Sequence, residues 1–172
     1  LGDIDGLISK GANVLIVLDE AYFEYLDPQL RGNAIDWIGL FPNLLVTRTF
    51  SKAYGLAAMR VGYGVAAAPV ADLINRVRQP FNVNSIAQAG AIAALADEDF
   101  VDTSRKMNRQ GMEFLTRGFK RLGLPWIPSE ANFVSVRVGR AGEVYQRLLQ
   151  RGVIVRPIGG YAMPEYLRVT IG

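Results

Sequence analysis

The chain has 172 residues, half of them hydrophobic and a fifth charged, with a formal net charge of +3. This length is enough for one domain, or a domain and a half, and the hydrophobic half of the residues is enough for a buried core. The chain has no cysteine and no histidine, which excludes disulfides, thiolate nucleophiles, Ser-His-Asp triads and nearly all zinc sites. We therefore expect no metal, and the scattered positive residues do not predict a nucleic-acid partner.

The sequence also gives no sign of a membrane partner. No stretch reaches the roughly 18 uninterrupted apolar residues that a span requires, and the start does not resemble a signal peptide. The absence of cysteine suits the cytoplasm, which we take as the expected location. The chain begins at Leu1 and ends in strand-like sequence at Gly172, so we expect a fragment rather than a complete protein.

Three apolar stretches in the first half predict strands of a sheet. They cover residues 14–18, 43–48 and 61–66. The first is apolar on both faces and ends in Asp19, which suits a strand buried inside a parallel sheet. An amphipathic stretch over 4–10, stopped by Gly11, predicts the end of a helix before it. Gly62 and Gly64 predict close backbone approach in the third strand.

Two shorter helices are predicted next. Pro69 opens the first, whose apolar residues recur at helical spacing up to Val77. Ser85 is expected to cap the second, which covers 86–96 and consists of small residues. Small residues allow close packing, so this helix is expected to be buried.

A long helix follows. It is predicted to begin at Asp97 or Asp99 and to end at Gly123, because Pro125 prevents its continuation. Its apolar stripe consists of Phe100, Met107, Phe114, Leu115, Phe119 and Leu122. We expect this helix to join two domains.

The last third changes in character. Residues 132–138 alternate between apolar and polar and predict a half-exposed strand, and 142–151 predict a helix stopped by Gly152. Two further strands are predicted over 153–156 and 167–171. The whole order predicts an α/β fold in which part of a large α/β layer is followed by a small α+β domain.

Two predicted strands end in polar residues of opposite charge. Asp19 follows the first strand, and the loop of Thr49, Ser51 and Lys52 follows the second. Ligands of open α/β sheets gather outside the carboxyl ends of strands, so both ends can face one ligand. Tyr22, three residues after Asp19, can be aimed at the same ring by a turn. Taken singly, Asp19 is equally explained as a helix cap or part of a structural salt bridge, and Lys52 as a surface lysine.

Arg60 adds a second kind of chemistry just before the third strand. Its guanidinium fork matches the oxygens of a phosphate, and the hydroxyls of Ser51 and Thr49 can complete the cup. Neither G-x-x-x-x-G-K-[ST] nor G-x-G-x-x-G is present, so nucleotide cradles are not supported. A carboxylate, a phenol, a lysine and a phosphate cup suit a cofactor with a pyridine nitrogen, a ring hydroxyl, an aldehyde and a phosphate. Pyridoxal 5'-phosphate is such a cofactor.

Several motifs together resemble a known family. They are Asp19-Glu20-Ala21-Tyr22, Thr49-Phe50-Ser51-Lys52-Ala53-Tyr54-Gly55-Leu56, Arg60-Val61-Gly62-Tyr63 and Leu167-Arg168-Val169-Thr170-Ile171-Gly172. In this order and spacing they resemble the fold-type-I pyridoxal-phosphate aminotransferases of class I and II, over nearly all of the chain. Gly152-Val153-Ile154-Val155-Arg156-Pro157, followed by Gly160-Tyr161 and Met163-Pro164-Glu165-Tyr166, is similar to the histidinol-phosphate aminotransferases within that family.

The resemblance implies a role for each residue of a set that we call the first constellation: Asp19, Tyr22, Thr49, Ser51, Lys52 and Arg60. Lys52 would form the internal aldimine with the cofactor and, once released by the substrate, act as the base for the 1,3-proton shift. Asp19 would keep the pyridine nitrogen protonated, which preserves the ring as an electron sink. Tyr22 would donate a hydrogen bond to the ring hydroxyl. The phosphate would be held by Thr49, Ser51 and Arg60.

The resemblance also implies a substrate. Arg168 matches the arginine that receives the anionic group of the substrate in this fold. Arg156, twelve residues earlier, would add a second cation, which suits a phosphate dianion better than a carboxylate. The implied reaction is transamination between L-histidinol phosphate and 2-oxoglutarate in histidine biosynthesis. Arg156 is also explained as a surface charge at a strand edge.

Family members are homodimers, and the resemblance assigns residues 1–98 to the end of the large cofactor-binding domain and 99–172 to the small domain. The family's amino-terminal half supplies further cofactor contacts that are not found here, so the isolated chain is expected to be inactive. The sequence 57–59, Ala-Ala-Met, departs from the family pattern before Arg60. Alternatives remain open: an aromatic aminotransferase, a decarboxylase of a phosphorylated amino acid, or a non-catalytic fragment or regulator. Asn82 and Asn84 receive no role.

Overall fold

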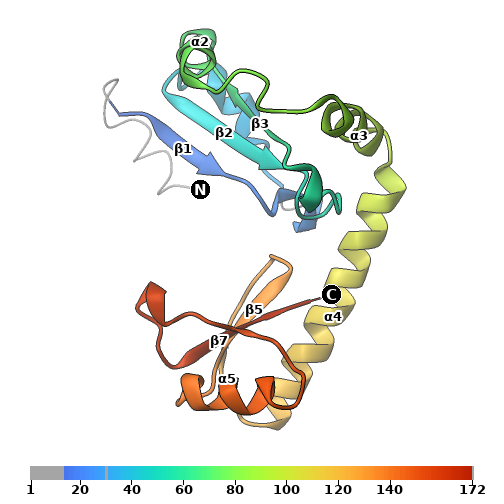
Figure 1. Cartoon of the computed structure of the whole chain (residues 1–172), viewed down its shortest axis with the longest axis vertical. Coiled ribbons are helices and arrows are strands. Elements are labelled where there is room, and N and C mark those ends of the chain that lie inside the picture. The colour runs from blue at the N-terminus through green and yellow to red at the C-terminus, as the bar shows by residue number, and fades with distance from the viewer. Residues whose placement is uncertain (1–13, 30, 172) are drawn as a thin grey trace. The chain divides into compact units, whose positions relative to one another are not determined.

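The structure is a computed structural model that describes residues 14–29 and 31–171. These residues fall into two compact units, Leu1–Val101 and Asp102–Gly172, each combining a sheet with helices (Figure 1). The mixed α/β character agrees with the sequence prediction. The helix end predicted over 4–10 lies outside the described residues.

The first unit contains a three-stranded sheet in the order β1-β2-β3. Strands β1 (Ile16–Asp19) and β2 (Leu44–Thr49) are parallel, whereas β3 (Gly62–Ala66) runs antiparallel to β2. The sequence predicted the three strands but not the reversal of the third. The prediction that the first strand is buried on both faces is wrong, because Val17 is 55% exposed and only the opposite face of β1 packs against the described core.

Short 3₁₀ helices, which the sequence did not predict, connect these strands. They are η1 (Phe23–Tyr25), η2 (Ala34–Gly39) and η3 (Ala57–Met59). The η2 segment covers the buried face of the sheet. That core comprises Ile16, Leu18, Ala34, Ile35, Trp37, Ile38, Phe41, Leu44 and Val46. It fixes β1 against β2 and so sets where both strands end.

Two α-helices complete this unit, α2 (Ala68–Val77) and α3 (Ser85–Leu95). The prediction that Ser85 caps the second helix is wrong. Asn84 is the cap, since its side-chain oxygen accepts the backbone N–H of Ala87 at 2.8 Å. Only one side of α3 is buried, at Ala87 and Ala91, while its isoleucines are exposed. The expectation of a fully buried helix was therefore too strong.

The long helix α4 (Glu98–Arg121) begins where predicted, capped by the Asp97 carboxylate, which accepts the Phe100 N–H at 3.1 Å. The predicted apolar stripe is largely wrong, since Phe114 is 67% exposed. The contact with the second unit's core uses the side of the helix that carries Asn108, Gly111 and Phe119, so only part of the predicted stripe lies on it. The two compact units divide within this helix, at Val101 and Asp102, and the domain boundary expected after residue 98 stays a prediction.

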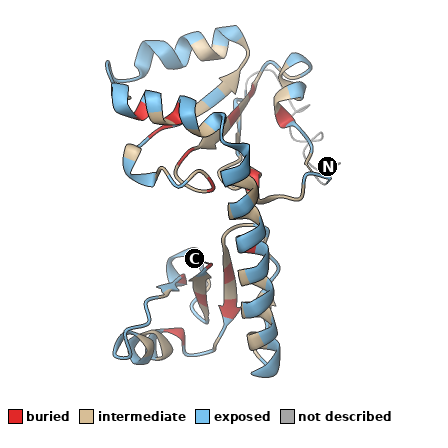
Figure 2. Cartoon of the chain, turned by 90° about the vertical axis from the view of Figure 1, so that its right-hand side faces the viewer, coloured by how far each residue is buried: buried red, intermediate tan, exposed pale blue. Residues whose placement is uncertain are grey.

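The second unit contains a four-stranded antiparallel sheet in the order β4-β5-β7-β6. Its strands are β4 (Trp126–Ile127), β5 (Phe133–Arg137), β6 (Arg156–Pro157) and β7 (Tyr166–Thr170), and α5 (Ala141–Leu149) packs on one face. The expected strand over 153–156 is reduced to its end, because Ile154 is 80% exposed and finds no place in the core. Figure 2 shows the buried strand positions of both units in red.

Candidate active site

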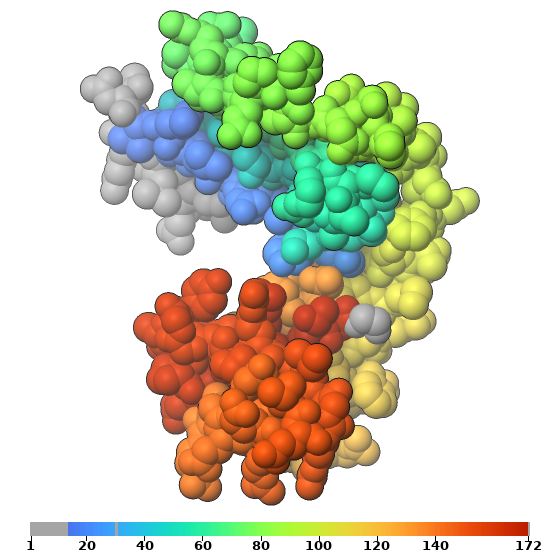
Figure 3. All heavy atoms as spheres, in the orientation of Figure 1, coloured from blue at the N-terminus to red at the C-terminus, as the bar shows by residue number. Residues whose placement is uncertain are grey.

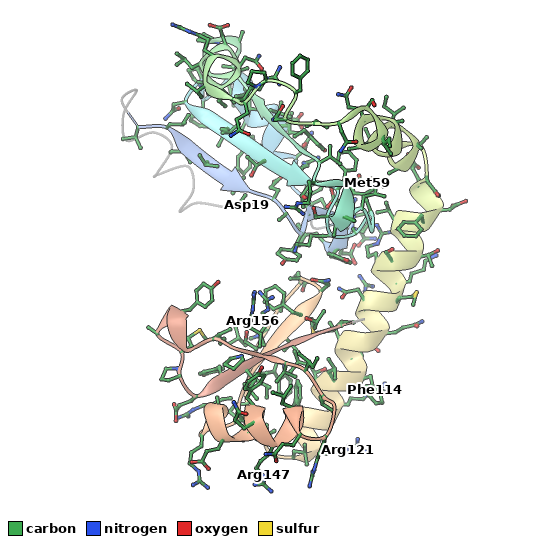
Figure 4. All side chains as sticks on the ribbon, in the orientation of Figure 1. Asp19, Met59, Phe114, Arg121, Arg147 and Arg156 are labelled. Carbon is green, nitrogen blue, oxygen red and sulfur yellow. The ribbon has the colours of Figure 1, made fainter. Side chains whose placement is uncertain are left out.

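The first constellation lies at the carboxyl ends of β1 and β2. These strands are parallel, and Asp19 pairs with Thr47, so the segments that follow β1 and β2 leave the sheet at the same edge. Figure 4 labels Asp19 at the end of β1. The Lys52 ammonium nitrogen lies 5.6 Å from the centre of the Tyr22 ring. The structure therefore brings the predicted lysine and the predicted phenol together.

The turn after β1 is held by Asp19 itself. The backbone N–H of Ala21 donates to the Asp19 carboxylate at 3.1 Å. This turn leads directly into η1, which begins after Tyr22. Asp19 thus closes a turn rather than capping a helix, and it remains exposed to solvent. Because a carboxylate has four lone-pair positions, one capping bond leaves it able to accept from a ligand.

The predicted phosphate residues form a second group around the end of β2. The backbone N–H of Ser51 donates to the Thr49 hydroxyl at 3.1 Å, and the Arg60 guanidinium reaches the Ser51 hydroxyl at 3.5 Å. The antiparallel pairing of Thr49 with Gly62 explains this proximity, since it returns the chain to the end of β2. The three residues thus gather two hydroxyls and a cation.

Arg60 has an unusual backbone. Its φ of 53° and ψ of 48° are left-handed, a conformation that costs a non-glycine residue about 1 kcal/mol or more. Its guanidinium also donates to the Ala57 carbonyl at 2.9 Å, which folds the side chain back over η3. Met59, which Figure 4 labels, is the last residue of η3 and directly precedes Arg60. The loop around 55–60, teal in Figure 3, forms an exposed surface of this unit, so a ligand has access to Arg60.

Arg156 and Arg168 lie in the second unit and pair directly opposite each other on β6 and β7. The Arg168 guanidinium lies 4.7 Å from the centre of the Phe133 ring, and its Nε is buried without a hydrogen-bond partner. Arg156 is exposed at the sheet edge. Like charges directly opposite one another destabilise a sheet, and an unsatisfied buried donor adds to the cost. An anion would relieve both.

The sequence did not predict a largely buried ion pair between Glu20, which follows Asp19, and Arg48, which precedes Thr49. Arg48 forms an ion pair with Glu20 at 2.8 Å, with side chains that are 11% and 12% exposed. The Arg48 guanidinium also stacks on the Phe23 ring, 3.7 Å from its centre. A charged residue within an otherwise apolar strand was the available signal, because arginine is rarely buried without a partner.

Glu24 is a second buried acid in this cluster. It is 5% exposed, and its Oε2 atom has no hydrogen-bond partner. Burial raises the pKa of this carboxyl, although its backbone N–H, Arg48 and Arg31 act in the opposite direction. Burial also raises the pKa of Tyr54, and the negative charge of Glu24 adds to this shift.

An open groove of about 1040 Å³ lies elsewhere in the first unit, between α2, the loop 78–83 and α3. None of the predicted cofactor residues lines this groove, so we do not assign the active site to it despite its size. Asn82 accepts a hydrogen bond from Arg78 at 2.9 Å, and Asn84 caps α3. Both asparagines therefore have structural roles at this groove.

Within residues 14–29 and 31–171, no three acidic side chains are grouped so as to hold a metal ion. Over the same described part of the chain, no helix combines the length and apolar character needed to cross a membrane.

Comparison with known proteins identifies the family. The model of the family "Aminotransferase class I and II" matches residues 3–172. The chain belongs to this family. It is 60% identical over 168 residues to a histidinol-phosphate aminotransferase of Methylobacillus flagellatus, and 57% identical over 162 residues to histidinol-phosphate aminotransferase 2 of Pseudomonas fluorescens.

A solved structure gives the fold of such a class I and II aminotransferase. The histidinol-phosphate aminotransferase from Sinorhizobium meliloti, crystallised with pyridoxal 5'-phosphate, matches 91% of this chain with a TM-score of 0.83 and 34% identity. This confirms the predicted fold class. The alignments cover 98% and 94% of this chain but 46% and 44% of the two curated relatives. The chain thus spans about half the length of the relatives it matches.

Proposed function

We propose that this chain is the carboxyl-terminal part of a pyridoxal-phosphate-dependent aminotransferase that exchanges an amino group between L-histidinol phosphate and 2-oxoglutarate in histidine biosynthesis. The observation that carries the proposal is the proximity of Lys52 to Tyr22 at the sheet edge that also bears Asp19. The 60% identity with the Methylobacillus flagellatus relative supports the choice of reaction.

The residues present fit pyridoxal phosphate. The Lys52 amine can bind its aldehyde, the Asp19 carboxylate can accept from its pyridine nitrogen, and the Tyr22 phenol can reach its hydroxyl. The phosphate fits the group of Thr49, Ser51 and Arg60. When bound, the cofactor supplies an aldehyde and a ring that withdraws electrons. The Asp19 carboxylate, by its charge, favours the protonated nitrogen on which that withdrawal depends.

Lys52 is also our candidate for proton transfer, because the chain contains no histidine. Lysine is one of the side chains that can act as a general base. Arg60 follows eight residues later and approaches the neighbouring Ser51. We therefore assign to Arg60 the binding of phosphate beside Lys52.

The substrate assignment depends on Arg156 and Arg168. Their direct opposition and the unsatisfied Arg168 Nε favour a ligand with several anionic oxygens. Histidinol phosphate carries such a group. A decarboxylase of a phosphorylated amino acid would use the same pair, and this is our second candidate. An aromatic aminotransferase explains Arg156 less well, because an aromatic amino acid has no phosphate for a second cation to bind. A non-catalytic role stays open for the isolated chain.

We further propose that residues 1–98 belong to the large cofactor-binding domain and 99–172 to the small domain. The complete enzyme would be a cytoplasmic homodimer whose partners are small molecules, a phosphorylated amine donor and a 2-oxo acid.

A chimera tests this function. The amino-terminal part of the Methylobacillus flagellatus relative is joined to this chain, and amino transfer from L-histidinol phosphate to 2-oxoglutarate is measured. We expect turnover in the chimera and negligible turnover in the isolated chain. Release of carbon dioxide from a phosphorylated amino acid, without amino transfer, would favour the decarboxylase instead.

A further inference from the structure

Arg48 connects the two strand ends that carry the candidate cofactor residues. It lies in β2, four residues before Lys52. Its Nε donates to the Glu20 carboxylate at 2.9 Å, and one terminal nitrogen forms an ion pair with the same carboxylate oxygen at 2.8 Å. Glu20 directly follows Asp19, and its backbone N–H donates to the Thr47 carbonyl at 2.9 Å. The segment that leaves β1 is therefore tied to β2 by both its backbone and its side chain.

A second contact of Arg48 reaches the residue after Tyr22. The guanidinium carbon lies 3.7 Å from the centre of the Phe23 ring, a close cation–π distance. Arg31 approaches the same ring at 5.2 Å and donates to the Glu24 and Leu26 carbonyls at 2.7 and 3.1 Å. The turn that carries Tyr22 is thus held by two arginines, through the Phe23 ring and through the backbone carbonyls of Glu24 and Leu26.

The third strand restrains Arg48 as well. Burial disfavours the charge of Arg48, but hydrogen bonds to Glu20 and Tyr63 outweigh it, and its pKa is raised. A side chain at Gly62 would approach the Arg48 carbonyl oxygen to 2.7 Å, so the two backbones lie in tight contact. The guanidinium is therefore a fixed and permanently charged group at the centre of the three strands.

We propose that Arg48 is a positioning residue: by holding Glu20 and Phe23 it sets where Asp19 and Tyr22 stand relative to Lys52. This inference rests on the proposed function only for the identity of the ligand. Lysine cannot replace the arginine, because the planar guanidinium places two nitrogens against the Glu20 carboxylate and also stacks on the Phe23 ring.

Stability alone does not account for this ion pair. A buried ion pair often contributes little compared with a well-packed apolar pair of similar volume, because desolvation offsets the attraction. What such a pair supplies is a defined geometry. In this chain Asp19 precedes Glu20 and Tyr22 precedes Phe23, the two residues that Arg48 contacts. Asp19 and Tyr22 are also the residues that need a defined orientation toward a flat ring.

The first part of the test needs no cofactor. The Tyr22 ring and the Lys52 side chain are observed by NMR in the 172-residue chain, in wild type, Arg48→Lys and Arg76→Lys. Arg76 is an exposed arginine of α2 in the same unit and serves as the matched control. We expect Arg48→Lys to move both sets of resonances and Arg76→Lys to leave them in place. Unmoved resonances in Arg48→Lys overturn the inference.

The second part places the same substitutions in the chimera, titrates each protein with pyridoxal phosphate, and follows the visible absorbance of the bound cofactor. Arg48→Lys is expected to weaken binding about tenfold, the effect of about one charged hydrogen bond. Val46→Ala, a cavity variant in the same strand, lowers thermal stability without touching the cluster and should keep the affinity. Equal losses in Val46→Ala and Arg48→Lys would mean that Arg48 is merely structural.

The two parts separate the two hypotheses. If the wild-type chimera shows no cofactor absorbance, the proposed function fails, and the NMR comparison alone decides whether Arg48 positions Tyr22 and Lys52. If wild type binds and Arg48→Lys binds equally well, only the inference fails. Glu20→Gln supplies a cross-check, because its effect on binding should not add to that of Arg48→Lys.

Discussion

The two units carry their candidate ligand groups in opposite ways. In the first unit the groups are held in place by neighbours: Ser51 bonds to Thr49, Arg60 approaches Ser51, and Lys52 lies against Tyr22. In the second unit Arg168 keeps a buried Nε without a partner while a like charge faces it across the strands. The first arrangement suits a permanently bound group, and the second suits an anion that comes and goes.

The largest expected effect is at Lys52. In the chimera, Lys52→Ala should abolish the visible absorbance of bound pyridoxal phosphate, because no other residue of the first constellation has an amine. Lys106→Ala, at an exposed position of α4, is the control and should keep the full band. A Lys52→Ala variant that retains the band would show that the lysine was assigned wrongly.

The next largest effect is expected at Arg156, the exposed cation of the second unit, and concerns the selectivity between the two substrates. We expect Arg156→Gln to weaken L-histidinol phosphate by about tenfold or more, because a charged hydrogen bond is lost, and to affect 2-oxoglutarate much less. The measurement is KM for each substrate in the chimera. Arg151→Gln, at another exposed arginine of this unit, should change neither. Equal losses for both substrates would remove the proposed selectivity.

Close backbone packing gives a stability test of the two units. Gly62→Ala should lower the free energy of unfolding by about 1–3 kcal/mol, because the new methyl group meets the rigid Arg48 carbonyl at 2.7 Å. Gly111→Ala, whose methyl group meets the Ile171 side chain, should lose less, since a side chain can move. Gly118→Ala, in open space on α4, should gain up to about 1 kcal/mol. Urea unfolding would measure all three, and a neutral Gly62→Ala would contradict the packing.

The smallest effect concerns Glu24. Its pKa is raised in the folded protein, so the folded state binds more protons than the unfolded state once the pH exceeds about 4.5, the ordinary value for glutamate. Stability should therefore fall as the pH rises through the interval between the unfolded and folded pKa. Glu24→Gln should lose this fall, whereas Asp72→Asn, at an exposed site on α2, should keep it. An unchanged pH profile in Glu24→Gln would show that the buried carboxyl does not titrate there.

The sequence predicted most strands and helices of the fold, and the site residues that it proposed stay predictions. Strands and helices followed from apolar runs and from stops such as Gly123 and Gly152, both of which have positive φ. The charge of Arg48 within a strand was a signal of the cluster, but its partner Glu20 could not be predicted, because the two residues lie 28 positions apart in the sequence. The antiparallel third strand and the left-handed Arg60 were missed because tertiary packing, rather than local propensity, determines them.

The failures on the long helix have a similar cause. An apolar stripe at helical spacing predicts a buried face only if a partner lies against it. Phe114 is exposed, whereas Asn108 is buried and donates to the Ala131 carbonyl at 3.2 Å. The pattern alone could not reveal which side meets the sheet.

The most direct test is to find which lysine binds the cofactor. The chimera is incubated with pyridoxal phosphate, reduced with borohydride so that the bond becomes permanent, and digested for mass spectrometry. We expect the added mass on the peptide that contains Lys52, with Lys106 and Lys120 unlabelled. A label shared among the exposed lysines, or absent from Lys52, would contradict the proposed active site.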